Sequence, residues 1–142
     1  MTIAKVIEGR ERNIVHCDPG TTVREAARLL AENRIGALPV IEGGKVVGIF
    51  SERDLLYCVA KEAGVALLHD VRSVMTAPAI TVEPATDALE ALSLMTRRRI
   101  RPLPVVKGEE LVAFVSIGDL VKYRVDQVES EAQAMREYIT TA

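Results

Sequence analysis

The sequence predicts an α/β (α+β) fold made of two β-α-β-β-α repeats, related by a pseudo-twofold axis and followed by an extended C-terminal helix. The first observation is an internal duplication, because residues 18–55 and 83–120 share fifteen identities in thirty-eight aligned pairs. The second is that short β-branched runs alternate with segments of helical period. The third is a Ser-x-x-Asp turn at 51–54 that recurs 65 residues later at 116–119.

Composition narrows the class of protein. The chain has 142 residues, of which 49% are hydrophobic and 27% charged, as in ordinary globular proteins. A net charge of −2 gives no general attraction to nucleic acid or to an anionic membrane. No apolar run reaches the length of a membrane span, and the N-terminus lacks the apolar core of a signal peptide. We therefore expect a cytoplasmic protein.

The elements of the first repeat follow from local signals. A short helix is expected over residues 2–8, then a strand at Ile14-Val15 that ends in the Asp-Pro-Gly turn at 18–20. The next helix begins at Thr21 or Thr22, with Glu25 placed to complete a capping box.

Two strands and a further helix complete the unit. The strands cover 38–41 and 46–50, joined through a Gly-Gly hairpin, and the last helix starts at Ser51. The second repeat follows the same order, with a strand at 80–82, a helix capped by Asp87, strands at 103–106 and 111–115, and a helix from Ser116.

This order divides the chain into a first repeat (2–63), a connector (64–73), a second repeat (74–124) and a helical tail (125–142). One repeat offers too little core to be secure alone. Two copies can bury their apolar faces against each other, which leaves a cleft on the axis where a small ligand can bind.

The tail has its own pattern. Apolar residues recur at steps of four and three, which is a heptad seam. This predicts that the last helix runs to about Tyr138 and either pairs with a second copy or an effector, or folds back on its own module. We favour a homodimer contact. The seam residues are Val121, Val125, Val128, Ala132, Met135 and Ile139.

Three motifs recur in register: h-x-x-D/E-P-x-x-T before the first helix, L-P-V in the middle strand, and G-h-h-S/T-x-x-D before the last helix. Together they resemble a pair of cystathionine-β-synthase (CBS) domains, called a Bateman module, over about residues 2–124. The resemblance implies a stand-alone, dimeric regulatory protein that is not an enzyme and has no cofactor. It also implies an adenosine-containing ligand in the cleft, such as AMP, ATP, NAD or S-adenosylmethionine.

The resemblance implies that the Asp of each Ser-x-x-Asp turn binds the ribose hydroxyls and that the Ser approaches the phosphate. These residues are Asp54 with Ser51 and Asp119 with Ser116. A carboxylate can accept both hydroxyl protons of a cis-diol, and a helix N-terminus favours an anionic phosphate. The same turns could also be plain capping boxes, and the two interpretations are compatible.

Further residues are expected around the ligand. The resemblance implies that Arg101 and Lys122 face the phosphates, and Arg53, inside the first Ser-x-x-Asp turn, could also neutralise phosphate. The counterparts of these three cations in the other repeat are uncharged. The two half-sites should therefore differ in affinity or in ligand. Adenine is expected against apolar and backbone groups of Ile14, Val15, Ile35, Gly36, Ala37, Ile80, Ile100 and Pro102.

We thus predict a ligand-sensing module that binds AMP, ADP or ATP, or as a second choice NAD(H), and signals occupancy to an effector protein that the sequence does not identify. One alternative is a purely structural dimerisation module. A less favoured alternative is a nucleic-acid binder that uses the arginines of 97–101. His16 with Cys17, and His69 with Cys58, lack the spacing of a metal site or a catalytic thiol.

Overall fold

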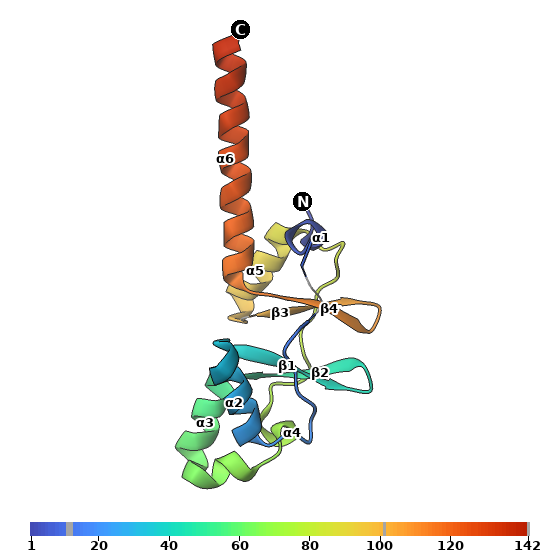
Figure 1. The fold of residues 1–142 in the computed structure, drawn as a ribbon, viewed down its shortest axis with the longest axis vertical. Helices are drawn as coiled ribbons and strands as arrows, with labels where there is room; N and C mark the ends of the chain where they lie inside the picture. The colour runs from blue at the N-terminus through green and yellow to red at the C-terminus, as the bar shows by residue number, and fades with distance from the viewer. Residues whose placement is uncertain (11–12, 101, 142) are drawn as a thin grey trace.

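The computed structural model describes residues 1–10, 13–100 and 102–141. Two small antiparallel sheets meet at the middle of the molecule, and helices cover their outer sides (Figure 1). This confirms the predicted mixed fold with its two repeats and long terminal helix. One lobe holds α2 (Val23–Asn33), β1 (Ala37–Glu42), β2 (Lys45–Ser51), α3 (Glu52–Glu62), the 3₁₀ segment η1 (Ala63–Leu68) and α4 (Val71–Val74). The other holds α1 (Ile3–Val6), α5 (Ala88–Arg98), β3 (Leu103–Lys107), β4 (Glu110–Val115) and α6 (Ile117–Thr141).

The helices begin where side chains can accept hydrogen bonds from their first N–H groups. Thr22 caps α2 by accepting from the Glu25 amide at 3.2 Å, so the helix starts at the second of the two candidate threonines. Asp87 caps α5 through the amides of Leu89 and Glu90. Each cap satisfies donors that would otherwise lack a partner at the helix terminus.

The first strand of each repeat is shorter than predicted. At Cys17 and at Val82 only a single parallel bridge forms, to Val40 and to Val105 respectively, and Ile14-Val15 is not a strand. In the first repeat, Cys17 donates to Pro39 O and accepts from Ile41 N. The next bonds of a parallel ladder would need N–H groups from Pro39 on one side and Pro19 on the other. Proline has none, so the ladder stops after one bridge.

The same arrangement occurs 65 residues later, where Val82 donates to Pro104 O and accepts from Val106 N. Pro84 and Pro104 occupy the positions of Pro19 and Pro39. The expected strand at 80–82 is therefore also reduced to one residue, for the same physical reason.

Each lobe has its own apolar core, and the chain crosses between the lobes. Ile3 of α1 is fully buried in the core formed by α5, β3 and β4, whereas Val71 of α4 is buried in the core of α2, β1 and β2. Main-chain bonds hold both helices: Ile3 N donates to Thr86 O and Val71 N to Thr21 O, each at 2.8 Å. Residues 2–7, which the sequence-based division places in the first repeat, thus pack on the second lobe.

The last helix, α6, is the longest element and projects beyond α5 and α1 (Figure 1). Leu120 is buried in the second core, and from residue 128 to residue 141 every side chain is exposed. The tail therefore does not fold back on its own module. Among the helices of the described residues, none combines the length and apolar character needed to cross a membrane.

Candidate functional site

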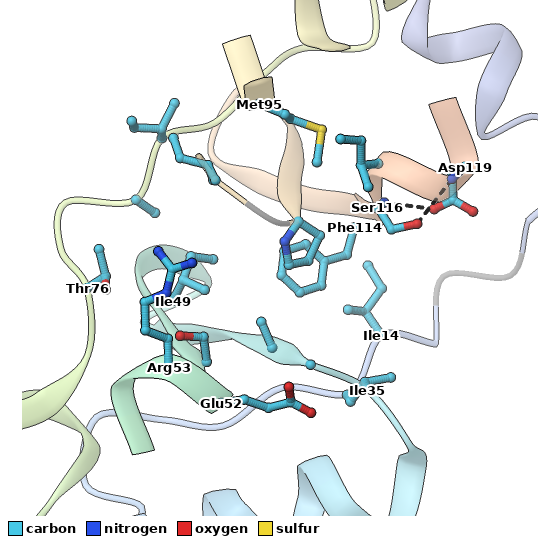
Figure 2. Close-up of a pocket in the computed structure, with 18 of the residues that line it drawn as sticks. Ile14, Ile35, Ile49, Glu52, Arg53, Thr76, Met95, Phe114, Ser116 and Asp119 are labelled. Carbon is cyan, nitrogen blue, oxygen red and sulfur yellow. Dashed lines mark hydrogen bonds between the residues drawn. The ribbon is translucent and has the colours of Figure 1, made fainter. Parts of the chain in front are cut away.

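A cleft of about 1380 Å³ lies between the two lobes and is lined by both. The first lobe contributes the turn 51–54, and the second contributes Ser116, Ile117 and Asp119 of the equivalent turn. Figure 2 shows Glu52 and Arg53 on one side of this cleft, Ser116 and Asp119 on the other, and Phe114 between them. The internal duplication thus places two equivalent turns at one cavity.

In the first turn, Ser51 and Asp54 form a complete capping box at the start of α3. Asp54 Oδ2 accepts from the Ser51 amide and from Ser51 Oγ, each at 2.9 Å, and the Asp54 amide donates to Ser51 Oγ at 3.2 Å. Asp54 Oδ1 accepts from Thr76 Oγ1 at 2.9 Å. The carboxylate is therefore fixed by two neutral hydroxyls and one amide.

In the second turn, Ser116 and Asp119 repeat the arrangement at the start of α6. Asp119 Oδ2 accepts from the Ser116 amide at 2.8 Å, and the Asp119 amide donates to Ser116 Oγ at 3.1 Å. Here, however, the carboxylate also pairs with Arg10, whose Nη2 lies 2.9 Å from Oδ1. Burial alone would raise the pKa of Asp119, but the Ser116 amide and the Arg10 guanidinium outweigh it and lower this pKa.

Arginines outnumber carboxylates among the described residues that line the cleft. Three acidic side chains, Glu52, Asp54 and Asp119, face five arginines, although the whole chain carries a net charge of −2. The local excess of positive charge favours an anionic ligand. The lining arginines are Arg10, Arg34, Arg53, Arg98 and Arg99.

Two of these arginines have an uncommon backbone conformation. Arg34 and Arg99 end α2 and α5 with φ of +53° each, in the left-handed region that usually takes glycine at this position. They are 65 residues apart, so both repeats place an arginine there. Non-glycine residues in the left-handed region cluster at functional sites. The repetition of arginine at positions 34 and 99 was visible in the sequence, and the prediction did not use it.

Most predicted site residues come together at the cleft. Lys122 is exposed on α6 and is not among the lining residues, and Arg101 lies outside the described residues. The predicted residues that do line it are Ser51, Arg53, Asp54, Ser116, Asp119, Ile14, Val15, Ile35, Gly36, Ala37, Ile80, Ile100 and Pro102.

The sequence prediction missed Arg10 and Thr76, which touch the two aspartates. Both lie on the segments that cross between the lobes. The stretch from Ile3 to Cys17 is three residues longer than the equivalent stretch from Val71 to Val82, and Arg10 lies on the longer one. Alignment of the repeats at a spacing of 65 therefore gives Arg10 no equivalent residue, and the sequence did not mark it as a site residue.

The cysteine and histidine side chains that the structure describes do not belong to a cluster that could bind a metal ion. Within residues 1–10, 13–100 and 102–141, no three His, Cys, Asp or Glu side chains gather in a way that could hold a metal ion. Burial, with a smaller contribution from the charge of Asp18, raises the pKa of the Cys17 thiol to about 11. That thiol is therefore protonated at neutral pH.

Comparison with known proteins identifies the fold. The family model of the CBS domain matches residues 10–61 and again residues 71–126. The chain belongs to the CBS-domain family. The two matches make it a tandem CBS pair, and each match contains one Ser-x-x-Asp turn.

Individual relatives support this assignment. The mitochondrial CBS domain-containing protein CBSX3 of Arabidopsis thaliana is 33% identical over 97% of this chain and 71% of its own length. The crystal structure of the CBS-domain containing protein ATU1752 of Agrobacterium tumefaciens is 32% identical and superimposes with a TM-score of 0.81, covering 87% of this chain and 99% of that one. The structure of CBSX2 in complex with AMP is 28% identical, with a TM-score of 0.77 over 90% and 98% of the two chains.

Proposed function

We propose that this CBS pair is a regulatory module, without catalytic activity, that binds an adenine nucleotide in the cleft between its repeats. It signals nucleotide binding to an effector protein. The observation that carries the proposal is the pairing of two capped Ser-x-x-Asp turns with an excess of arginine in one cleft. The carboxylates suit ribose hydroxyls, and the arginines and helix N-termini suit phosphates.

A relative supports the same ligand class. CBSX2 is the partner of AMP in a solved complex and shares 28% identity with this chain over nearly its full length. AMP, ADP or ATP is therefore the first choice of ligand. The cleft of about 1380 Å³ exceeds the roughly 300–1000 Å³ of an ordinary ligand pocket, so a dinucleotide such as NAD(H) is the second choice.

The mechanism follows from where the cleft lies. A nucleotide that touches both lobes binds best to one relative arrangement of them, and it shifts the population toward that arrangement. An effector that binds this arrangement better than the unliganded one then responds to the nucleotide. The coupling free energy is at most the difference in nucleotide affinity between the two arrangements. The chain is proposed to act as a homodimer, so that both copies present the change.

The test is a thermal-shift screen of AMP, ADP, ATP, NAD⁺, NADH and S-adenosylmethionine on the wild type, Asp54→Ala and Asp119→Ala. A ligand present at a hundredfold its Kd stabilises the folded state by about 2.7 kcal/mol, which gives a clear rise in Tm. A rise with one nucleotide that is lost in an aspartate variant supports the proposal and names the half-site.

Asp87→Ala is the matched control, because Asp87 also caps a helix but does not line the cleft. All three variants should lose about 1 kcal/mol of stability from the cap, and the response to nucleotide should be weakened only in Asp54→Ala or Asp119→Ala. If no compound in the screen raises the Tm of the wild type, the structural dimerisation module replaces the nucleotide sensor. A nucleotide response that survives both cleft substitutions would reject the assigned site.

A further inference from the structure

The projecting part of α6 carries an apolar stripe that nothing in the described chain covers. Val121, Val125 and Val128 are each nearly half exposed, and Met135 and Ile139 more than 60% exposed. Leu120 and Ile117 pack against the second core, so the module holds only the base of the helix. We define the α6 stripe as Val121, Val125, Val128, Ala132, Met135 and Ile139.

We propose that the α6 stripe pairs with the α6 stripe of a second copy as a parallel, in-register coiled coil. The four-three spacing assigns Val125, Ala132 and Ile139 to heptad position a, and the other stripe residues to position d. Helix α6 spans Ile117–Thr141, so all six stripe residues lie on one continuous helix. This inference does not depend on the nucleotide proposal.

The charges beside the stripe select the partner and the direction. Positions g and e flank the seam, and in a parallel pair each g residue faces the e residue five positions later on the other helix. Arg124 then faces Glu129, and Glu131 faces Arg136, so both pairs are attractive, and symmetry repeats each of them. Arg124 bonds Gln127, and none of the four forms an ion pair within the part of the chain that the structure describes.

An antiparallel pair that overlaps the whole stripe would reverse this outcome. The stripe runs from 121 to 139, so its midpoint is residue 130. In this direction positions e face positions e and positions g face positions g. Glu129 would then face Glu129 of the second copy, Glu131 would face Glu131 of the second copy, and Lys122 would approach Arg136 of the second copy. Like charges across the seam oppose that direction, so the sequence favours the parallel pair.

Cysteine cross-linking tests the direction in the full chain with Cys58→Ser, since Cys17 is buried. A parallel pair places two copies of Met135→Cys opposite each other, and mild oxidation should give a linked dimer. An antiparallel pair would separate them by about 15 Å, too far for a disulfide, and would instead link Met135→Cys to Val125→Cys. Glu137→Cys, on the outer face, is the control that should not link.

Sedimentation velocity tests the seam and the charges. Val128→Lys should raise the dimer Kd at least tenfold, while circular dichroism shows that the helix is retained. Glu129→Arg should raise the Kd by roughly tenfold, and Arg124→Glu/Glu129→Arg should restore it.

A monomeric wild type at 100 μM, a dimer unaffected by Val128→Lys, or cross-linking only between residues 125 and 135 would overturn the proposal. Because Val128 does not line the cleft, loss of the dimer in Val128→Lys with an unchanged thermal response separates this inference from the nucleotide proposal.

Discussion

The guanidinium of Arg10 lies across the carboxylate of Asp119, with Nη2 2.9 Å from Oδ1 and Nη1 3.3 Å from Oδ2. The equivalent carboxylate, Asp54, instead accepts a hydrogen bond from the neutral hydroxyl of Thr76. A charged partner binds a carboxylate more strongly than a neutral one. Under the proposed function, a ribose would have to compete with a stronger partner at Asp119 than at Asp54, so the two proposed half-sites should differ in affinity despite their common register.

Replacing Arg10 should strengthen binding of a ribose at Asp119. The test ligand is adenosine, which has the diol but no phosphate, and the background is Asp54→Ala, in which binding reports the second half-site. Arg10→Gln should lower the Kd for adenosine by roughly two- to fivefold, the range of an exposed ion pair. Isothermal titration calorimetry measures this change.

Arg24→Gln is the control for the Arg10 substitution, since Arg24 is an exposed arginine of α2 that does not line the cleft. It should leave the Kd unchanged. Weaker adenosine binding in Arg10→Gln would mean that Arg10 contacts the nucleoside directly instead of competing with it.

The lowered pKa of Asp119 predicts how stability changes with pH. The folded state holds this pKa below its ordinary value of 3.8, so the ionised carboxylate stabilises the fold at all pH values above that. The contribution is lost as the pH falls below 3.8 toward the folded pKa. Urea unfolding should therefore show Asp119→Asn to be less stable than the wild type at about pH 6, with a smaller difference at about pH 3. An equal difference at both pH values would show that the charge of Asp119 contributes nothing.

Gly48 is expected to be intolerant of even one methyl group. A Cβ there would lie 2.6 Å from Met75 Sδ and 3.0 Å from the Thr76 carbonyl oxygen, which belong to the segment paired with Ile49. Gly48→Ala should reduce the free energy of unfolding by about 1–3 kcal/mol and disturb the contact of Thr76 with Asp54.

Gly64→Ala is the matched control for Gly48, because a Cβ at Gly64 meets no atom within 4 Å. Chemical denaturation of the two variants should show loss of stability in Gly48→Ala only. Equal stabilities would mean that the crossing segment moves aside without penalty.

The two thiols should differ in reactivity. Cys17 is buried and its pKa is raised to about 11, so little reactive thiolate is present near neutral pH, whereas Cys58 is partly exposed. Iodoacetamide followed by mass spectrometry should find Cys58 modified first in the native protein and both thiols modified in urea. Rapid modification of native Cys17 would show that the first lobe opens readily.

The sequence was sufficient to predict the local features of this fold. The helix starts at Thr22, Ser51 and Asp87 depend on hydrogen bonds within three residues, and the duplication supplied each of these signals in a second, related form. The meeting of Ser51 and Ser116 at one cleft followed from the expected pseudo-twofold relation, and the structure places both there.

Other features depend on contacts between distant parts of the chain. That α1 packs on the second core requires knowing where residues 2–7 go, and no local pattern in them encodes this. Arg10 was missed because its segment is three residues longer than the equivalent one and so has no aligned counterpart. The short bridges at Cys17 and Val82 could have been predicted, because the prolines that limit them are visible in the sequence.

The crossing of α1 to the second lobe also has a consequence for protein synthesis. The first lobe can assemble its core once Met75 has left the ribosome, because every member of that core lies between Val15 and Met75. The second core needs both Ile3 and Leu120, and Leu120 is synthesised more than a hundred residues after Ile3. Ile3 therefore stays without its core partners until Leu120 has been made, and α1 is a segment that a chaperone could bind on the nascent chain during that interval.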